Sequence, residues 1–185
     1  MIKYEHFTIY RSDSRKGREN HPSEDYSLCK RGVFAVFDGV TLLHQRPYPR
    51  PSPAAEAAKL GATTVVRTIL DGKSACGGQT LIRRSFVKAN EEIRKLNEKL
   101  GIASRTVDYI SKQYAATVGC FGFVGDDKFY FGQINDCGIA SFDPQGKRES
   151  DVVLNQTPLL KHLAKMEGEG RFEAGSKEEH IYVRS

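Results

Sequence analysis

The sequence predicts a single domain of mixed α and β structure (class α+β), and three observations support this. Short strand-like segments fill the first forty residues and return after residue 114 of the 185-residue chain. Two long segments between them carry apolar residues at helical spacing. The composition, 39% apolar and 28% charged, is typical of a soluble globular domain, and no apolar stretch approaches the roughly 20 residues that cross a bilayer.

The first expected strands follow one another closely. Residues 6–10 (HFTIY) alternate polar and apolar side chains, residues 25–31 (DYSLCKR) are short and mixed, and residues 32–39 (GVFAVFDG) contain a continuous apolar run. A strand that is apolar on both faces is normally interior to a sheet. This run ends in Asp38-Gly39, which is either a common turn dipeptide or a carboxylate metal ligand at the tip of a rigid strand.

Two helices are expected next, after a connector rich in alternate prolines. Ser52-Pro53 is an N-cap residue followed by proline at the first helical position, and residues 71–78 (DGKSACGG) end that helix. The second helix runs from about Thr80 to Leu100, with Gly101 as its stop. The glycine-rich connection predicts an antiparallel pair that covers one sheet face. The apolar stripes consist of Ala58, Ala62, Val65, Val66, Ile69 and Leu70, and of Ile82, Phe86, Ala89, Ile93, Leu96 and Leu100.

Further strands are expected after Tyr114. Residues 116–124, 129–134 and 137–143, joined by GDDK and IND and closed by PQGK, predict a three-stranded antiparallel meander. Glycines inside these strands, at positions 119, 122 and 132, indicate close packing of a neighbouring backbone. Beyond the meander, Thr157-Pro158 predicts a short helix to about Met166, and residues 181–185 (IYVRS) read as a strand.

Charge and cysteine usage narrow the classes of partner and location. The net charge is +5, but Lys and Arg are interleaved with Glu, as in NEEIRKLNEKL, which is typical of a solvated helix face. We therefore expect no nucleic-acid partner. The cysteines, at positions 29, 76, 120 and 137, form no CxxC pair, which favours reduced intracellular thiols. With no hydrophobic signal core near the N-terminus, we expect a cytoplasmic protein without a membrane partner.

Three acidic residues lie where the expected strands begin or end: Asp25, Asp38 and Asp136. Magnesium and manganese prefer oxygen ligands, and carboxylates at strand ends supply them with little reorganisation. Each aspartate taken singly is more often a turn or capping residue. The three together predict a metal site.

Three segments and the helical pair between them resemble the metal-dependent serine/threonine protein phosphatases of the 2C type (PPM family). The segments are SEDYSL, GVFAVFDGV and AATVGCFGFVGDDKFYFGQINDCGIASFDPQG. The resemblance implies a β-sandwich of two antiparallel sheets flanked by antiparallel helix pairs (αββα). It spans residues 1–185, as the N-terminal two-thirds of a family domain. It implies hydrolysis of phosphoserine or phosphothreonine in a phosphorylated protein substrate by a metal-activated water.

The resemblance also implies roles for individual residues. Asp25 binds one Mn²⁺ or Mg²⁺, and Glu24 assists through water. Asp38 bridges two metals and belongs to the catalytic centre, while the carbonyl of Gly39 ligates the second metal. Asp136 corresponds to a third, weaker metal site.

Other positions match or depart from the family pattern. Arg18, with Arg15 as the alternative, corresponds to the arginine that grips the substrate phosphate. Thr117 falls on a GSTA-like strand start. Val40 stands where many members carry a histidine proposed as proton donor, and His44 lies too far along the chain to replace it, so a surface-loop position is expected for it.

No residue after Asp136 matches the family's two further metal-binding aspartates, which occur in Asp-Gly and Asp-Asn motifs. We therefore expect a phosphatase domain that is incomplete at its C-terminus. The competing hypothesis is a naturally shortened relative: a non-catalytic, phosphatase-like binding or regulatory module.

Overall fold

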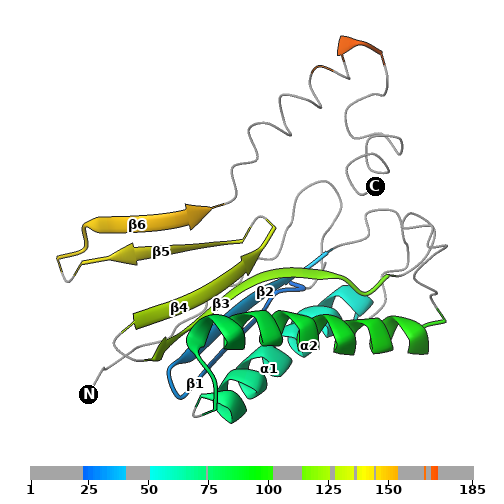
Figure 1. Cartoon of the computed structure of the whole chain (residues 1–185). Helices are drawn as coiled ribbons and strands as arrows, with labels where there is room; N and C mark the ends of the chain where they lie inside the picture. Colours follow the sequence, from blue (N-terminus) through cyan, green and yellow to red (C-terminus); the bar gives the residue numbers. More distant parts are fainter. Residues whose placement is uncertain are drawn as a thin grey trace.

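The computed structural model describes residues 23–40, 51–73, 75–101, 114–125, 128–135, 137–143, 145–153, 165 and 168–170. Within these ranges the protein is of mixed α and β structure, as predicted: a four-stranded antiparallel sheet carries two helices on one face, and a separate two-stranded sheet lies beside it (Figure 1). The elements are β1 (Tyr26–Lys30), β2 (Val33–Gly39), α1 (Pro53–Gly72), α2 (Gly78–Lys99), β3 (Thr117–Gly125), β4 (Lys128–Ile134), β5 (Gly138–Phe142) and β6 (Arg148–Val153).

The larger sheet has the strand order β1-β2-β3-β4, so the apolar strand β2 is interior, as predicted. Every neighbouring pair is antiparallel, and Ala35 on β2 lies between Leu28 on β1 and Phe121 on β3. Arg31 and Gly32 form the turn between β1 and β2, both with positive φ. This tight connection sets the register that brings the start of β1 to the end of β2.

The helix boundaries follow the predicted capping signals. Ser52 has extended backbone angles, accepts a hydrogen bond from the Ala55 amide at 3.1 Å, and is followed by proline at the start of α1. Helix α2 begins at Gly78, two residues before the expected Thr80. It ends where Gly101, at φ +72°, donates its amide to the Glu98 carbonyl at 3.0 Å.

The core lies between the helix pair and one face of the four-stranded sheet (Figure 1). Helix α1 packs on β1, β2 and β3, whereas α2 packs on α1 and β4. The buried residues come from alternate positions of β2 and β3 and from the helices; they are Val33, Ala35, Phe37, Phe121 and Phe123 on the strands and Ala58, Ala62, Val65, Val66, Ile69, Leu81 and Ala89 on the helices. All of the helix residues except Leu81 belong to the predicted stripes. Leu100, predicted on the α2 stripe, is instead 41% exposed at the helix end.

The predicted three-stranded meander is wrong at its last strand. β3 and β4 pair as expected, but β5 pairs with β6 in a separate two-stranded sheet and not with β4. Asn135, which follows β4, has a φ of +64°, so the chain turns out of the first sheet there. The β5–β6 turn contains Asp143, whose carboxylate accepts the amides of Gln145 and Lys147 at 3.0 and 2.7 Å.

The strand glycines contact mainly aromatic rings, which corrects the expectation of neighbouring backbone. A Cβ at Gly119 would lie 2.6 Å from the Phe37 ring, and one at Gly132 would lie 2.6 Å from the Phe86 ring. A Cβ at Gly122 would meet the Phe129 ring at 2.4 Å, with the Tyr130 carbonyl at 3.0 Å. These glycines therefore accommodate large side chains from adjacent elements.

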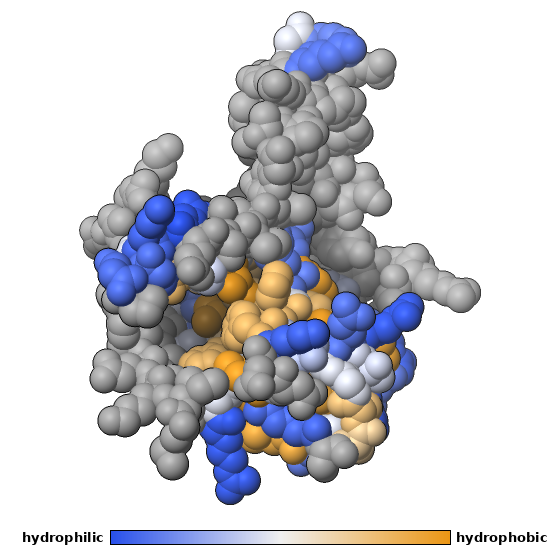
Figure 2. Space-filling model, turned by 60° about the vertical axis from the view of Figure 1, so that its left-hand side comes forward, coloured by the Kyte–Doolittle hydropathy of each residue, from blue (hydrophilic) through white to orange (hydrophobic). Residues whose placement is uncertain are grey.

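The sheet face away from the helices is apolar and partly open. The register places Phe34, Val36, Phe129 and Phe131 on this outer face, and the exposed fractions of the last three are 49%, 48% and 39%. The rings of Phe129 and Phe131 stack with centroids 6.2 Å apart. Figure 2, which brings the left-hand side of Figure 1 forward, shows an apolar area of surface with polar residues along part of its edge.

Some predicted elements lie outside the described residues: the strand at 6–10, the strand at 181–185, and the helix at 157–166 except Lys165. No helix in the described part of the chain combines the length and apolar character needed to cross a membrane.

Candidate functional site

Asp25 and Asp38 meet at one end of the four-stranded sheet. The end pair of the β1–β2 ladder is Tyr26 with Phe37, and the same register, continued by one residue, would set Asp25 opposite Asp38. Both residues are exposed. Directly opposed side chains in an antiparallel pair have Cβ atoms about 4.5–5.5 Å apart, and two like charges in that position destabilise the pair. An arrangement of this kind is well suited to a cation held between the carboxylates.

The backbone of Asp38 is held from the β3 side. Asp38 pairs with Val118 in the β2–β3 ladder, and the Thr117 hydroxyl donates to the Asp38 carbonyl at 2.6 Å. The amide of Val40 continues this support by donating to the Ala116 carbonyl at 3.0 Å. The position of the Asp38 backbone is therefore set from the β3 side.

The segment that leads into β3 is fixed by a buried asparagine of α2. The Asn97 amide group donates to the Ala115 carbonyl at 2.8 Å, and its oxygen accepts the Ala115 amide at 2.8 Å. Asn97 is 5% exposed and Ala115 is fully buried. This two-point contact replaces a strand partner for Ala115 and orients the chain two residues before Thr117.

Gly39 is buried where β2 meets the N-terminus of α1. An added Cβ would lie 2.7 Å from the Ala54 carbonyl oxygen and 2.8 Å from the Glu24 Cβ. Such distances are shorter than real Cβ contacts. The absence of a side chain at Gly39 therefore permits three segments to meet: the end of β2, the first turn of α1, and the residues that precede β1.

Glu24 is directed toward α1, away from exposed Asp25. Its side chain is 4% exposed and accepts a hydrogen bond from the hydroxyl of Ser52, which is 3% exposed. The same Ser52 hydroxyl accepts the Ala55 amide, so one oxygen caps α1 and contacts Glu24. A carboxyl group close to a helix N-terminus is also favoured by the helix dipole.

Several predicted site residues lie outside the described residues: Arg18, its alternative Arg15, Asp136 and His44. The structure therefore brings together Asp25, Asp38, Gly39 and Glu24 at one end of the sheet, with Thr117 beside them. It separates Glu24 from the two aspartates by burying it against Ser52.

The two aspartates fit a hard divalent cation in donor type. Both supply carboxylate oxygens, and magnesium is commonly held by one or two carboxylates together with waters and substrate phosphate oxygens. Within the described ranges, no group of three or more His, Cys, Asp or Glu residues is arranged to hold a metal. The remaining positions of a coordination shell must therefore come from water, substrate, the Gly39 carbonyl or residues outside those ranges.

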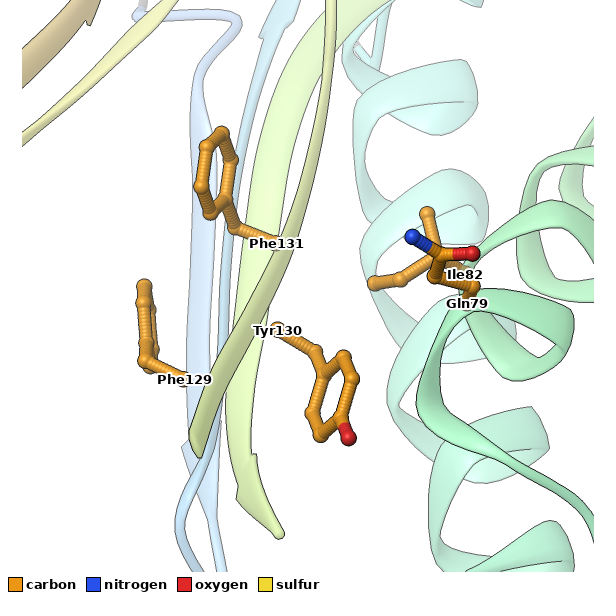
Figure 3. A pocket seen from close by; sticks show the side chains of 5 residues that line it. All are labelled: Gln79, Ile82, Phe129, Tyr130 and Phe131. Carbon is orange, nitrogen blue, oxygen red and sulfur yellow. The ribbon is translucent and has the colours of Figure 1, made fainter. Parts of the chain in front are cut away.

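A hollow of about 240 Å³ lies at the other end of the sheet, between the start of α2 and β4. Its lining is Gln79, Ile82, Phe129, Tyr130 and Phe131, with Tyr130 on the helix side of β4 and the two phenylalanines on the other side (Figure 3). In the register, Phe129 is close to Phe123, and Phe123 pairs with Val33 at the start of β2. Asp38 lies at the opposite end of β2. This hollow is therefore separate from the aspartate pair.

Cys29 and Cys120 do not provide a reactive nucleophile at the site. Burial raises the pKa of the Cys120 thiol and of the Cys29 thiol above the ordinary value of 9.0, so both stay protonated at neutral pH. Cys120 lies on the outer sheet face, opposite Val36, and its sulfur contacts the Gly138 carbonyl at 3.4 Å.

Sequence reasoning identified Ser52 as an N-cap but missed its contact with Glu24, and it missed Asn97 entirely. The available signal for Asn97 is its place four residues after Ile93 on the apolar stripe of α2, where a polar residue needs a buried partner. Ser52 carries no such signal, because its partner lies 28 residues away in the sequence.

Comparison of the sequence with protein-family models gives no match, and comparison with curated proteins gives none either.

Proposed function

We propose that this chain is part of a metal-dependent phosphoprotein phosphatase of the 2C type, which hydrolyses phosphoserine or phosphothreonine with Mn²⁺ or Mg²⁺. The observation that carries the proposal is the β1–β2 register, whose end pair, Tyr26 with Phe37, brings the neighbouring residues Asp25 and Asp38 to the same end of the sheet. Neighbouring carboxylates supply the oxygen donors that a hard divalent cation prefers. The order of the sequence motifs and their resemblance to the PPM family supply the reaction class.

The residues of the chain have separate tasks in this proposal. Asp25 and Asp38 would hold the metal, with the Gly39 carbonyl as a further oxygen donor. Thr117 fixes the Asp38 backbone through its 2.6 Å hydrogen bond, which limits reorganisation at the site. When bound, the divalent cations supply an activated water and neutralise charge on the phosphoryl group. Arg18 is proposed to grip the substrate phosphate through its planar guanidinium.

A two-sheet sandwich of the phosphatase type is proposed for the fold. Two features support it: the apolar outer face of the four-stranded sheet, and the separate β5–β6 sheet. The contact of Cys120 with Gly138 brings the start of β5 to the outer face. A second sheet layer on this face would remove Val36, Phe129 and Phe131 from water, as sheet packing requires.

Asp38→Asn tests the proposal. The substitution keeps shape but removes the charge, so Mn²⁺ affinity measured by calorimetry should fall at least tenfold, and any Mn²⁺-dependent hydrolysis of p-nitrophenyl phosphate should be abolished. Asp71→Asn is the matched control, because Asp71 is an exposed aspartate of α1. It lies 17 residues from Ala54, about 25 Å along the helix.

Equal Mn²⁺ affinity in the wild type, Asp38→Asn and Asp71→Asn would contradict the metal assignment. Undetectable Mn²⁺ binding by the wild type would contradict it as well.

Val40 favours a second candidate, a phosphatase-like module that binds a phosphorylated partner without hydrolysing it. Its apolar side chain occupies the position of the family's proposed proton donor, while its backbone is held by Ala116. Mn²⁺ binding without hydrolysis, together with affinity for a phosphoserine peptide over its unphosphorylated form, would favour this module over the enzyme.

A further inference from the structure

Asp25 and Asp38 are held in different ways. Asp38 lies within β2 and is fixed by ladder pairing and by the Thr117 hydroxyl. Asp25 precedes β1, so its position depends on local contacts. One of these is with Ser23, whose hydroxyl donates to the Asp25 carboxylate at 3.1 Å in an exposed setting. Asp25 is also held indirectly, through the contacts of the adjacent residue, Glu24.

Glu24 provides the buried anchor for this segment. Its carboxyl group accepts a hydrogen bond from Ser52, and its Cβ lies against Gly39. Since the Ser52 hydroxyl also caps α1, Glu24 is attached to the end of a 20-residue helix that packs on three strands of the sheet. The contact is buried at both partners, where a hydrogen bond is stronger than at the surface and costly to lose.

We propose that Ser52 is a positioning residue for the carboxylate pair: by holding Glu24 it places Asp25 opposite Asp38. The inference rests on the proposed function, because it assigns Ser52 to the same metal site. The inference also gives Glu24 a role: it is held by Ser52 at the start of α1 and thereby links Ser52 to its neighbour Asp25. Groups that orient metal ligands in this way commonly change metal affinity by about 10–100-fold when they are replaced.

Ser52→Gly separates this role from helix capping. Glycine is tolerated at N-cap positions, so the exchange of the cap alone should lower the melting temperature by only about 1 °C, and loss of the buried hydrogen bond to Glu24 should lower it by about 2–8 °C more. Ser52→Thr keeps both the cap and the hydroxyl and is the rescue variant. Ile69→Val is the stability control: it shortens a fully buried side chain of the same helix and should lower the melting temperature by about 2–5 °C.

The measurement is a Mg²⁺ titration of the full chain, followed by the side-chain carboxyl ¹³C signals of Asp25 and Asp38. In the wild type both signals should shift with one midpoint. The midpoint should rise about tenfold or more in Ser52→Gly, return to within about twofold of wild type in Ser52→Thr, and stay at the wild-type value in Ile69→Val.

The outcomes distinguish the two proposals. If neither wild-type signal responds to Mg²⁺, the metal-dependent function is wrong. If both respond and the Ser52→Gly midpoint equals that of the wild type, the site exists and the positioning role of Ser52 is overturned. A shift in Ile69→Val equal to that in Ser52→Gly would also overturn it, because a loss of stability alone would then explain the change.

Discussion

Gly39→Ala should destabilise the fold through a steric conflict at the junction of β2 and α1. The added Cβ would lie 2.7 Å from the Ala54 carbonyl oxygen, and contacts become ordinary only from 3.4 Å, so the atoms must separate by 3.4 − 2.7 = 0.7 Å. Ala54 is in the first turn of α1, one residue from Ser52-Pro53, and its carbonyl cannot rotate away as a flexible side chain could. The strain must therefore move the helix start or β2.

Insertion of a methyl group into a close-packed site typically costs about 1–3 kcal/mol. With a urea dependence of about 2 kcal/mol/M for the free energy of unfolding, the midpoint should fall by about 0.5–1.5 M. Far-UV circular dichroism during urea titration measures this shift. Gly168→Ala is the control, since an added Cβ there meets no atom within 4 Å.

Equal midpoints for the Gly39→Ala and Gly168→Ala variants would refute the packing argument. Alanine retains the main-chain carbonyl of residue 39. A stability loss in this variant is thus independent of any role of that carbonyl as a metal ligand.

The remaining predictions concern α2 and the outer sheet face. Asn97→Ala should lower the free energy of unfolding by about 2–4 kcal/mol, because the amide and carbonyl of fully buried Ala115 lose their partner. The control, Asn90→Ala, replaces an exposed residue of α2 and should change the free energy of unfolding by less than about 0.5 kcal/mol. Coinciding urea titrations of the two variants would contradict this prediction. Since burial raises the pKa of Cys120 above 9.0, the unfolded thiol ionises first, and stability should decrease as pH rises above about 9. Cys120→Ala should lose part of this decrease in unfolding measurements between pH 7 and 10, and an unchanged pH dependence would show that this thiol does not contribute.

Elements with local signals could be predicted well. Ser52-Pro53 begins α1, and Gly101 ends α2 with the left-handed backbone that its missing Cβ allows. β1 and β2 lie within one or two residues of their predicted bounds. These features depend on contacts within a few residues of the chain, such as a hydroxyl and an amide three positions apart.

The candidate site was predictable in part for the same reason. The dipeptide Asp38-Gly39 at the end of an apolar strand indicated a fixed carboxylate, and the structure places it there, exposed, with Gly39 buried behind it. The metal role of Asp38 stays a prediction. The partner of Glu24 could not be predicted, because a glutamate beside an aspartate has no local pattern that shows which of the two will be buried.

By itself the sequence determined the mixed α and β class, the helix pair and its boundaries, and the interior place of β2. Only the tertiary structure decided that β5 leaves the first sheet to pair with β6, that Glu24 binds Ser52, and that Asp25 and Asp38 both lie next to the end pair of the β1–β2 ladder. Periodicity and capping report interactions between near neighbours in the chain. Sheet membership and the meeting of two carboxylates depend on register and packing between distant segments, and these are settled only when the whole core forms.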